Sequence, residues 1–218
     1  MPRNRPRQRA RVALLLGSAA LAAHAGTPVR YKIDPVHTRV VFDIDHAGFS
    51  RAIGTLSGSQ GSLQFDADDW STAKLDVVVP MQRLDMGDSG WSAAVFAPRF
   101  LDVRRYPEAR FVSRRVERTS DDAGNVGGDL TLHGVTRPLC MRLKLNRIAR
   151  YPLPPFHHTA GFSATASLRR SDFGMDSWLS LVGDTVELRI EAELGRRNGA
   201  DAGEAPDGPP PSDPRTTP

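Results

Sequence analysis

Two acidic side chains, Asp43 and Asp45, are the first groups in this chain whose spacing could support chemistry. Residues two apart on a strand point to the same face, so the two carboxylates could work as an acid–base pair, with His46 next to them. Acidic residues that alternate with apolar ones are also typical of the wet face of an amphipathic strand. Because this alternation accounts for both acids, the sequence favours a solvated strand face over a catalytic pair.

The histidines give weaker signals for a metal or ligand site. His157 and His158 are adjacent, so in a strand they would point to opposite faces and could not hold one metal ion from the same side. His133 precedes Gly134 in what the pattern predicts to be a tight turn. We expect a hydrogen bond that stabilises this turn rather than a contact to a ligand.

Cys140 is the single cysteine of the chain, and it lies in the polar register of a predicted strand, on the same face as Arg142. Nothing else nearby completes a nucleophilic site, so we interpret it as an inert structural cysteine. The chain also has no Gly-x-Ser-x-Gly, no phosphate-binding loop and no cofactor fingerprint. We therefore expect no catalytic residue, no metal and no cofactor, and a protein that is not an enzyme.

The elements that would position these residues are strands. The clearest is a hairpin over residues 128–145, in which two arms of alternating apolar and polar residues flank a break at residues 134–138. The same period of two recurs at residues 29–34, 40–45, 52–56, 63–65, 75–79, 109–116, 162–168 and 186–194. A short run at residues 91–96 is compatible with a helix that Pro98 would end.

Eight or so amphipathic strands with one helical insertion predict an all-β fold, either a barrel or a sandwich. The last strand, residues 186–194, is strongly one-sided and would leave a long exposed edge in an open sheet, which favours an antiparallel barrel.

Both ends of the chain differ from this domain. Alternate arginines from Arg3 to Arg11, an apolar run at residues 12–23 and the small-x-small end at Ala25 predict a Sec-type signal peptide over residues 1–25, cleaved after Ala25. The apolar run is too short for a spanning helix, which disfavours a retained anchor and a membrane-spanning protein. Residues 26–195 form the predicted domain, and residues 196–218, rich in Gly, Pro and Asp, predict a disordered tail.

The basic balance of the chain comes from the predicted signal peptide. The chain has 29 Lys and Arg against 25 Asp and Glu, but five arginines and no acid fall in residues 1–25, which leaves a net charge of about −1. No basic block remains, so nucleic acid and an anionic membrane surface are disfavoured as main partners.

The parity of the strands predicts which side chains face inward. Small residues among them leave room for a ligand, but they could equally face bulky partners across a dry core. We predict that the inner face and one covered end form the ligand-binding wall, with Trp91, Phe96 and Phe100 at the end and, along the strands, Val40, Phe42, Ile44, Val77, Val79, Phe111, Leu130, Leu132, Met141, Phe162, Ala164, Ala166, Leu188 and Ile190.

Four ordered motifs carry a resemblance to a known family. They are the hairpin Gly128 to Pro138 (GDLTLHGVTRP), Tyr31-Lys32-Ile33-Asp34 with His37, Phe100 to Pro107 (FLDVRRYP) leading to Phe111, and Gly183 to Leu188 (GDTVEL). In their order along the chain these motifs resemble the polyisoprenoid-binding YceI family over about residues 29–195. The resemblance implies a lipocalin-like, extended antiparallel barrel in the periplasm or secreted, with an elongated apolar tunnel for an isoprenoid-type chain.

The sequence departs from the family pattern in the helical insertion. Where family members usually carry an Arg-Asp pair and a histidine, this chain has Ser92 at the aspartate position and Ala94 at the histidine position. Any role of those polar groups in placing a ligand head group is absent or moved in this chain.

The function we expect is to bind, carry or sequester an amphiphile with a long isoprenoid-like tail in a cell-envelope or secreted protein. Two alternatives remain. One is a periplasmic enzyme that acts on such an amphiphile through Asp43, Asp45 or His133, and the other is a dry-core structural or stress protein without a ligand. The sequence leaves a homodimer open.

Overall fold

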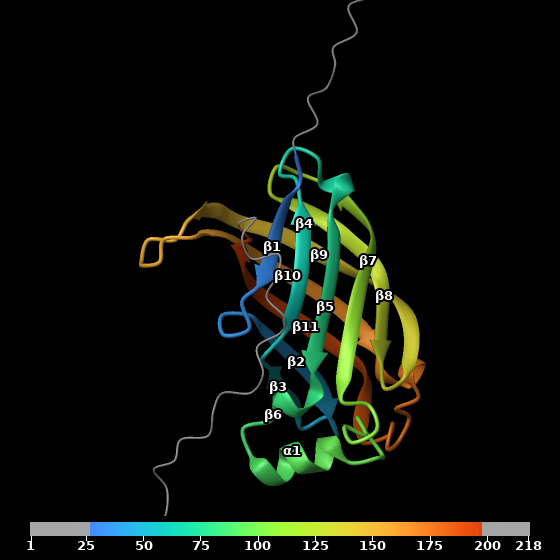
Figure 1. Ribbon diagram of the computed structural model, residues 1–218. Helices are drawn as coiled ribbons and strands as arrows, with labels where there is room; N and C mark the ends of the chain where they lie inside the picture. The colour runs from blue at the N-terminus through green and yellow to red at the C-terminus, as the bar shows by residue number, and fades with distance from the viewer. Residues whose placement is uncertain (1–26, 198–218) are drawn as a thin grey trace, which may run out of the picture.

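The computed structural model describes residues 27–197, and the predicted signal peptide and most of the predicted tail lie outside them. The described chain is almost entirely β-structure (Figure 1). Its elements are β1 (Val29–Ile33), β2 (Arg39–His46), β3 (Ser50–Leu56), β4 (Gln60–Phe65), η1 (Trp70–Thr72), β5 (Lys74–Pro80), η2 (Met81–Arg83), β6 (Leu84–Asp85), α1 (Ser89–Phe96), β7 (Glu108–Arg118), β8 (Ala123–Leu132), β9 (Val135–Arg150), β10 (His158–Arg169), η3 (Arg170–Phe173) and β11 (Val182–Arg196). No helix within this range is long and apolar enough to cross a membrane.

Eight antiparallel strands close into a barrel, as the sequence predicted. Their order is β1-β4-β5-β7-β8-β9-β10-β11, and the pairing of Ile33 with Leu194 joins the last strand to the first. Before it reaches β1, β11 pairs with β2 over Val182 to Glu191, and β2 continues into β3 and β6. These three strands extend the wall toward the end that carries α1 (Figure 1).

The central hairpin is tighter than the sequence predicted. Its turn is only His133 and Gly134, with φ values of 51° and 75°, and β9 begins at Val135 rather than after a five-residue break. Two successive positive φ values are typical of a type I′ turn, whose twist matches that of the strands. Pro138 is accommodated inside β9 opposite Asp129 because β10 pairs with β9 only as far as Arg142.

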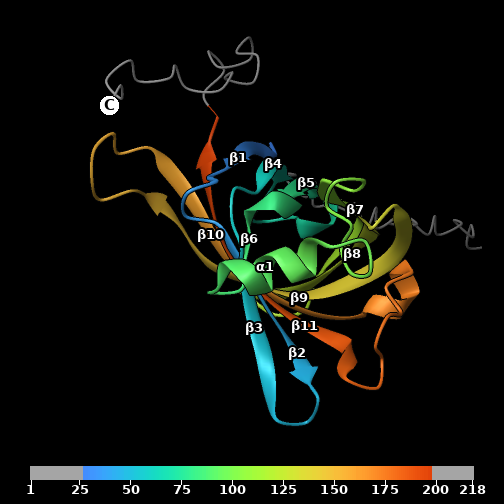
Figure 2. The same ribbon diagram turned by 90° about the horizontal axis from the view of Figure 1, so that it is seen from below.

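Helix α1 lies across one end of the barrel (Figure 2). The Asp88 side chain accepts a hydrogen bond from the Trp91 backbone N–H at 2.8 Å and caps the helix N-terminus. The Ser92 hydroxyl donates to the Asp88 carbonyl and accepts from the Met86 N–H, which ties the helix to the chain before it. The helix ends at Phe96, and the residue before Pro98 is extended, as the sequence predicted.

The other end of the barrel is closed by aromatic side chains. Trp70, only 1% exposed, makes an edge contact with Phe65 at 5.4 Å between ring centroids, and Phe65 makes another with Phe162 at 5.5 Å. The Trp70 Nε1–H donates to the Ala67 carbonyl at 3.2 Å, so its polar atom is satisfied. Packing at this end leaves the α1 end as the entrance to the interior.

Candidate ligand-binding cavity

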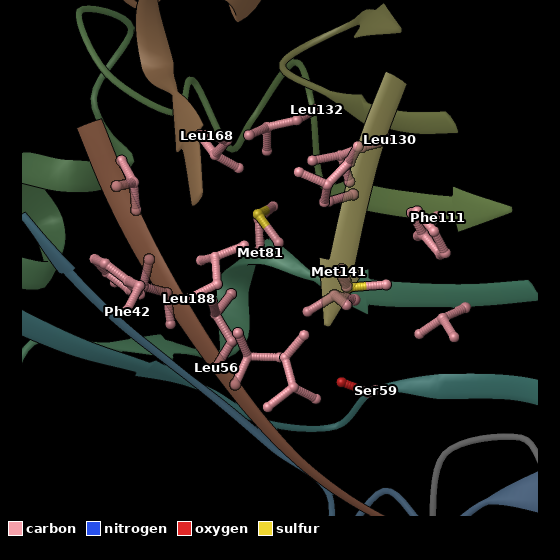
Figure 3. Close-up of a pocket in the computed structure, with 18 of the residues that line it drawn as sticks. Phe42, Leu56, Ser59, Met81, Phe111, Leu130, Leu132, Met141, Leu168 and Leu188 are labelled. Atoms are coloured by element: carbon pink, nitrogen blue, oxygen red, sulfur yellow. The ribbon is translucent and has the colours of Figure 1, made fainter. Parts of the chain in front are cut away.

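A cavity of about 590 Å³ runs through the inside of the barrel and reaches the α1 end. This volume lies within the range of roughly 300–1,000 Å³ that is typical of small-molecule sites. Side chains from strands on all sides point into it (Figure 3). Apart from the tryptophans, the polar or charged residues that line it are Thr38, His46, Ser59 and Arg170, so the wall is almost wholly apolar.

Most of the residues predicted for the ligand-binding wall surround this cavity. The predicted residues that line the cavity are Val40, Phe42, Ile44, Val77, Val79, Trp91, Phe100, Phe111, Leu130, Leu132, Met141, Phe162, Ala164, Leu188 and Ile190. Their role in binding stays a prediction, but the structure brings them around one space.

Phe96 and Ala166 are not among the residues that line the cavity, and their part in ligand binding stays a prediction. In α1 the residues that line the cavity are Trp91, Ala94 and Val95, because side chains three and four positions apart share one face of a helix. Ala166 is buried on the expected face of β10, and its cross-strand partner Leu188 lines the cavity beside it.

Many lining residues lie outside the predicted set, and two groups of them differ in whether a sequence pattern could have identified them. Ala52 and Leu56 of β3 follow the same alternation as the other strands, so parity could have identified them. Met175, Trp178 and Leu181 come from the irregular segment between η3 and β11, where no period exists to predict direction.

The entrance at the α1 end is rimmed by aromatic and aliphatic side chains that are partly in solvent. Trp178 and Leu181 line the cavity while remaining 54% and 55% exposed. The Trp178 ring contacts Phe100 at 5.9 Å between centroids, and the Arg99 guanidinium lies 5.0 Å from the Trp178 centroid. The Ala47 N–H donates to the Leu181 carbonyl at 2.6 Å, which joins the β2–β3 turn to the same rim.

Arg170 is the one charged side chain that is buried in the cavity wall among residues 27–197. Its guanidinium donates to four backbone carbonyls, those of Met175, Ser177, Val182 and Gly183. Burial lowers the pKa of Arg170, and the negative charges of Asp184 and Asp176 oppose this shift. The contacts show that this arginine holds the rim segment in place.

The remaining polar groups of the wall differ in how they are satisfied. Thr38 is buried, and its hydroxyl bonds to the Glu193 backbone at 3.3 Å. Ser59 is 1% exposed, and its Oγ has no hydrogen-bond partner within residues 27–197.

The carboxylates that suggested chemistry lie outside the cavity. Asp43 pairs with Arg51, and Asp45 accepts from the Gly48 N–H at 3.1 Å in the β2–β3 turn. Neither residue lines the cavity, and both carboxylates have partners on the outer surface. This arrangement agrees with a solvated strand face.

His133, His157 and Cys140 also lie away from the cavity, whereas His46 lines it at the rim. His133 Nδ1 donates to the Phe173 carbonyl at 3.0 Å, so its hydrogen bond ties the hairpin to η3. The prediction was a hydrogen bond that stabilises the turn itself, and this bond instead reaches a distant segment. The His157 ring stacks on Tyr151. Cys140 is exposed, and within residues 27–197 no three His, Cys, Asp or Glu side chains gather to hold a metal ion.

Comparison with known proteins agrees with this architecture. The model of the YceI-like domain matches residues 31–194. A UPF0312 protein of Pseudomonas savastanoi is 36% identical over 165 residues, which cover 75% of this chain and 85% of that protein. A UPF0312 protein of Pseudomonas putida is 34% identical over 183 residues, covering 83% and 94%.

Solved structures share the fold at low sequence identity. BcnA of Burkholderia cenocepacia superimposes with a TM-score of 0.67 at 19% identity, covering 74% of this chain and 98% of that chain. A polyisoprenoid binding domain from Saccharophagus degradans, implicated in plant cell wall breakdown, gives a TM-score of 0.61 at 11% identity, covering 78% and 99%. The family match over most of the barrel, together with these relatives, shows that the chain belongs to the YceI family.

Proposed function

We propose that this protein binds an amphiphile with a long, isoprenoid-like tail inside its barrel and carries or sequesters it. The observation that carries the proposal is the cavity of about 590 Å³, which has an almost wholly apolar wall and opens at the α1 end. The family and the Saccharophagus degradans domain, which is described as polyisoprenoid binding, support the same ligand class.

The hydrophobic effect is sufficient to hold such a ligand. Each buried methylene contributes roughly 0.8 kcal/mol, so a long hydrocarbon tail gains most of its binding free energy from the apolar wall alone. Selectivity would then come from the length of the cavity and from its few polar groups.

The proposal includes a location in the cell envelope or outside the cell. Its support is the predicted signal peptide at residues 1–25, which lies outside the described residues. An amphiphile with a long tail is poorly soluble in water, so a protein that transfers it between membranes must shield the tail. A barrel with an internal apolar cavity provides that shield.

The two alternatives are less well supported. An enzyme that used Asp43, Asp45 or His133 would need these groups at the cavity, and none of the three lines it. A dry core would be packed to the density of protein interiors, whereas this barrel retains a large internal volume.

Thermal unfolding with and without ligand tests the proposal. A ligand that binds only the folded state at 100 times its Kd stabilises that state by about 2.7 kcal/mol, which raises the Tm of a protein of this size by roughly 5–10 °C. We expect this shift when a long-chain prenol or quinone is added to the mature protein.

A pair of variants shows whether the shift comes from the cavity. Ala164→Phe places a ring in the lined space, whereas Thr165→Phe places the same ring on the outer face of the same strand. We expect the Ala164 variant to lose the ligand-induced shift and the Thr165 variant to keep it. Equal shifts in both variants, or none in the wild type with any long-chain prenol or quinone, would contradict binding in the cavity.

A further inference from the structure

Ser59 places a hydroxyl group in an otherwise apolar stretch of the cavity wall. It lies between β3 and β4, immediately before Gln60, and it lines the cavity while being only 1% exposed. Figure 3 shows its oxygen turned toward the apolar side chains of the interior. The oxygen is therefore directed at whatever occupies the cavity.

This hydroxyl has no partner in the protein. No donor or acceptor within residues 27–197 lies in hydrogen-bonding position to Ser59 Oγ. A buried hydroxyl without a partner costs free energy, which is why nearly all such groups in folded proteins are paired. Among the described residues, Ser59 Oγ, His133 Nε2 and Thr159 Oγ1 are the buried side-chain atoms without a partner, and of these Ser59 alone lines the cavity. A ligand in the cavity can therefore supply the partner that Ser59 lacks.

The other polar groups inside the barrel are already engaged. The Thr38 hydroxyl bonds to the Glu193 backbone, and Arg170 directs four of its five N–H donors at backbone carbonyls. His46 lies at the exposed rim, in contact with the Trp91 ring. Among the lining residues that the structure describes, Ser59 is thus the buried polar side chain that remains available.

The charge of the wall limits the ligand's head group. A phosphate or diphosphate buried near Ser59 would require a cation to offset the loss of its hydration. The buried cation of the wall, Arg170, is held by Met175, Ser177, Val182 and Gly183 and does not present its charge freely to the cavity. A single neutral hydroxyl suits an alcohol or a carbonyl oxygen.

We propose that Ser59 is an internal hydrogen-bonding subsite for an uncharged, oxygen-bearing group of the ligand, an alcohol or a carbonyl. This inference rests on the proposed function, since it assumes that a long-tailed amphiphile enters the cavity. It adds that the polar group of the ligand lies inside the barrel, and that a neutral head group is preferred to a phosphorylated one.

The test compares three C20 probes on the mature protein: geranylgeraniol, the corresponding hydrocarbon and geranylgeranyl diphosphate. Binding is followed through the fluorescence of the rim tryptophans Trp91 and Trp178. We expect Ser59→Ala to weaken geranylgeraniol binding about fivefold, which corresponds to about 1 kcal/mol for one neutral hydrogen bond. Binding of the hydrocarbon should be unchanged.

Ser62→Ala is the matched control, because Ser62 lies on β4 and is exposed. It should leave binding of all three probes as in the wild type. An equal effect of Ser59→Ala on the alcohol and the hydrocarbon would overturn the subsite, as would tighter wild-type binding of the diphosphate than of the alcohol.

The stability of the ligand-free protein provides a second readout. Removing a hydroxyl that has no partner should leave the Tm of Ser59→Ala unchanged or raise it. A lower Tm would mean that the hydroxyl bonds within the protein and would overturn the inference. If the wild type binds neither the alcohol nor the hydrocarbon, the proposed function itself fails, which is a different result from binding of both without discrimination by Ser59.

Discussion

The guanidinium of Arg170 donates a hydrogen bond from Nη1 to the carbonyl oxygen of Met175 at 2.6 Å, inside the wall of the cavity. Its other hydrogen bonds reach the carbonyls of Ser177, Val182 and Gly183. One buried side chain thus supplies hydrogen bonds both to the irregular segment before β11, at Met175 and Ser177, and to the first two residues of β11. That segment carries Trp178 and Leu181, so Arg170 sets the shape of the entrance.

Replacing Arg170 by methionine should destabilise the protein. The change leaves carbonyl oxygens without donors, and hydrogen bonds to charged groups contribute about 1.5–3 kcal/mol each, so we expect the free energy of unfolding to fall by roughly 2–4 kcal/mol after relaxation. Urea unfolding measures this. Arg169→Met is the control, because the neighbouring Arg169 is exposed, and it should change stability by less than about 1 kcal/mol. Equal stability of the wild type and Arg170→Met would contradict the assigned role.

Asp184 should contribute stability that disappears in acid. Burial raises the pKa of its carboxyl, but hydrogen bonds from Arg169 and from the N–H and hydroxyl of Ser171 outweigh burial and hold the pKa below its ordinary value. A carboxyl with a lowered folded-state pKa stabilises the fold above its unfolded pKa of about 3.9, and this contribution is lost as the pH falls through the folded value.

The Asp184→Asn variant should therefore be less stable than the wild type at pH 7, and the difference should shrink as the pH falls below about 4. Thermal unfolding between pH 7 and pH 2.5 measures both curves. Parallel curves for the two proteins over this range would show that Asp184 does not supply the acid-sensitive contribution.

Gly134 should not tolerate a side chain. Its φ is +75°, and an added Cβ would lie 2.5 Å from the Tyr106 ring, so Gly134→Ala combines backbone strain with a steric clash. The left-handed conformation alone costs an alanine about 1–2 kcal/mol. Gly127→Ala, in the same hairpin, would meet no atom within 4 Å and should be close to neutral in urea unfolding. Similar losses for both variants would exclude the strained turn as the cause.

Asp43 and His133 should be dispensable for ligand binding. Neither residue lines the cavity, so the Asp43→Asn, His133→Ala double variant should retain its prenol affinity within about twofold, a change worth about 0.4 kcal/mol. Its Tm should fall because His133 no longer donates to Phe173 or packs on Tyr106. Loss of turnover of a bound amphiphile in this variant, with the ligand still held, would instead support the enzyme alternative.

Much of this architecture could be predicted from the sequence, because a period of two is a property of each strand by itself. The inward placement of Phe42, Leu130 and Leu188 follows from that period once a strand is recognised. The ordered motifs then indicated which barrel these strands form.

What could not be predicted depends on contacts between distant segments. Trp178 and Leu181 face the cavity because Arg170 and Ala47 hold their backbone, and no local pattern encodes that direction. The hydroxyl of Ser59 has no partner because of how distant segments pack around it, which no local pattern encodes. Phe96 lies in a short helix, where the strand period does not indicate which side chains reach the cavity, and Trp91, Ala94 and Val95 of that helix line it.

Mass spectrometry of the protein expressed from its own full-length chain in a cell envelope, purified without detergent, tests the central claim most directly. The account predicts an added mass on the folded protein under native conditions, released on denaturation and extractable into organic solvent, that identifies a long-chain, oxygen-bearing lipid. A protein that carries no added mass, and whose Tm remains unchanged after incubation with long-chain prenols and quinones, would contradict it.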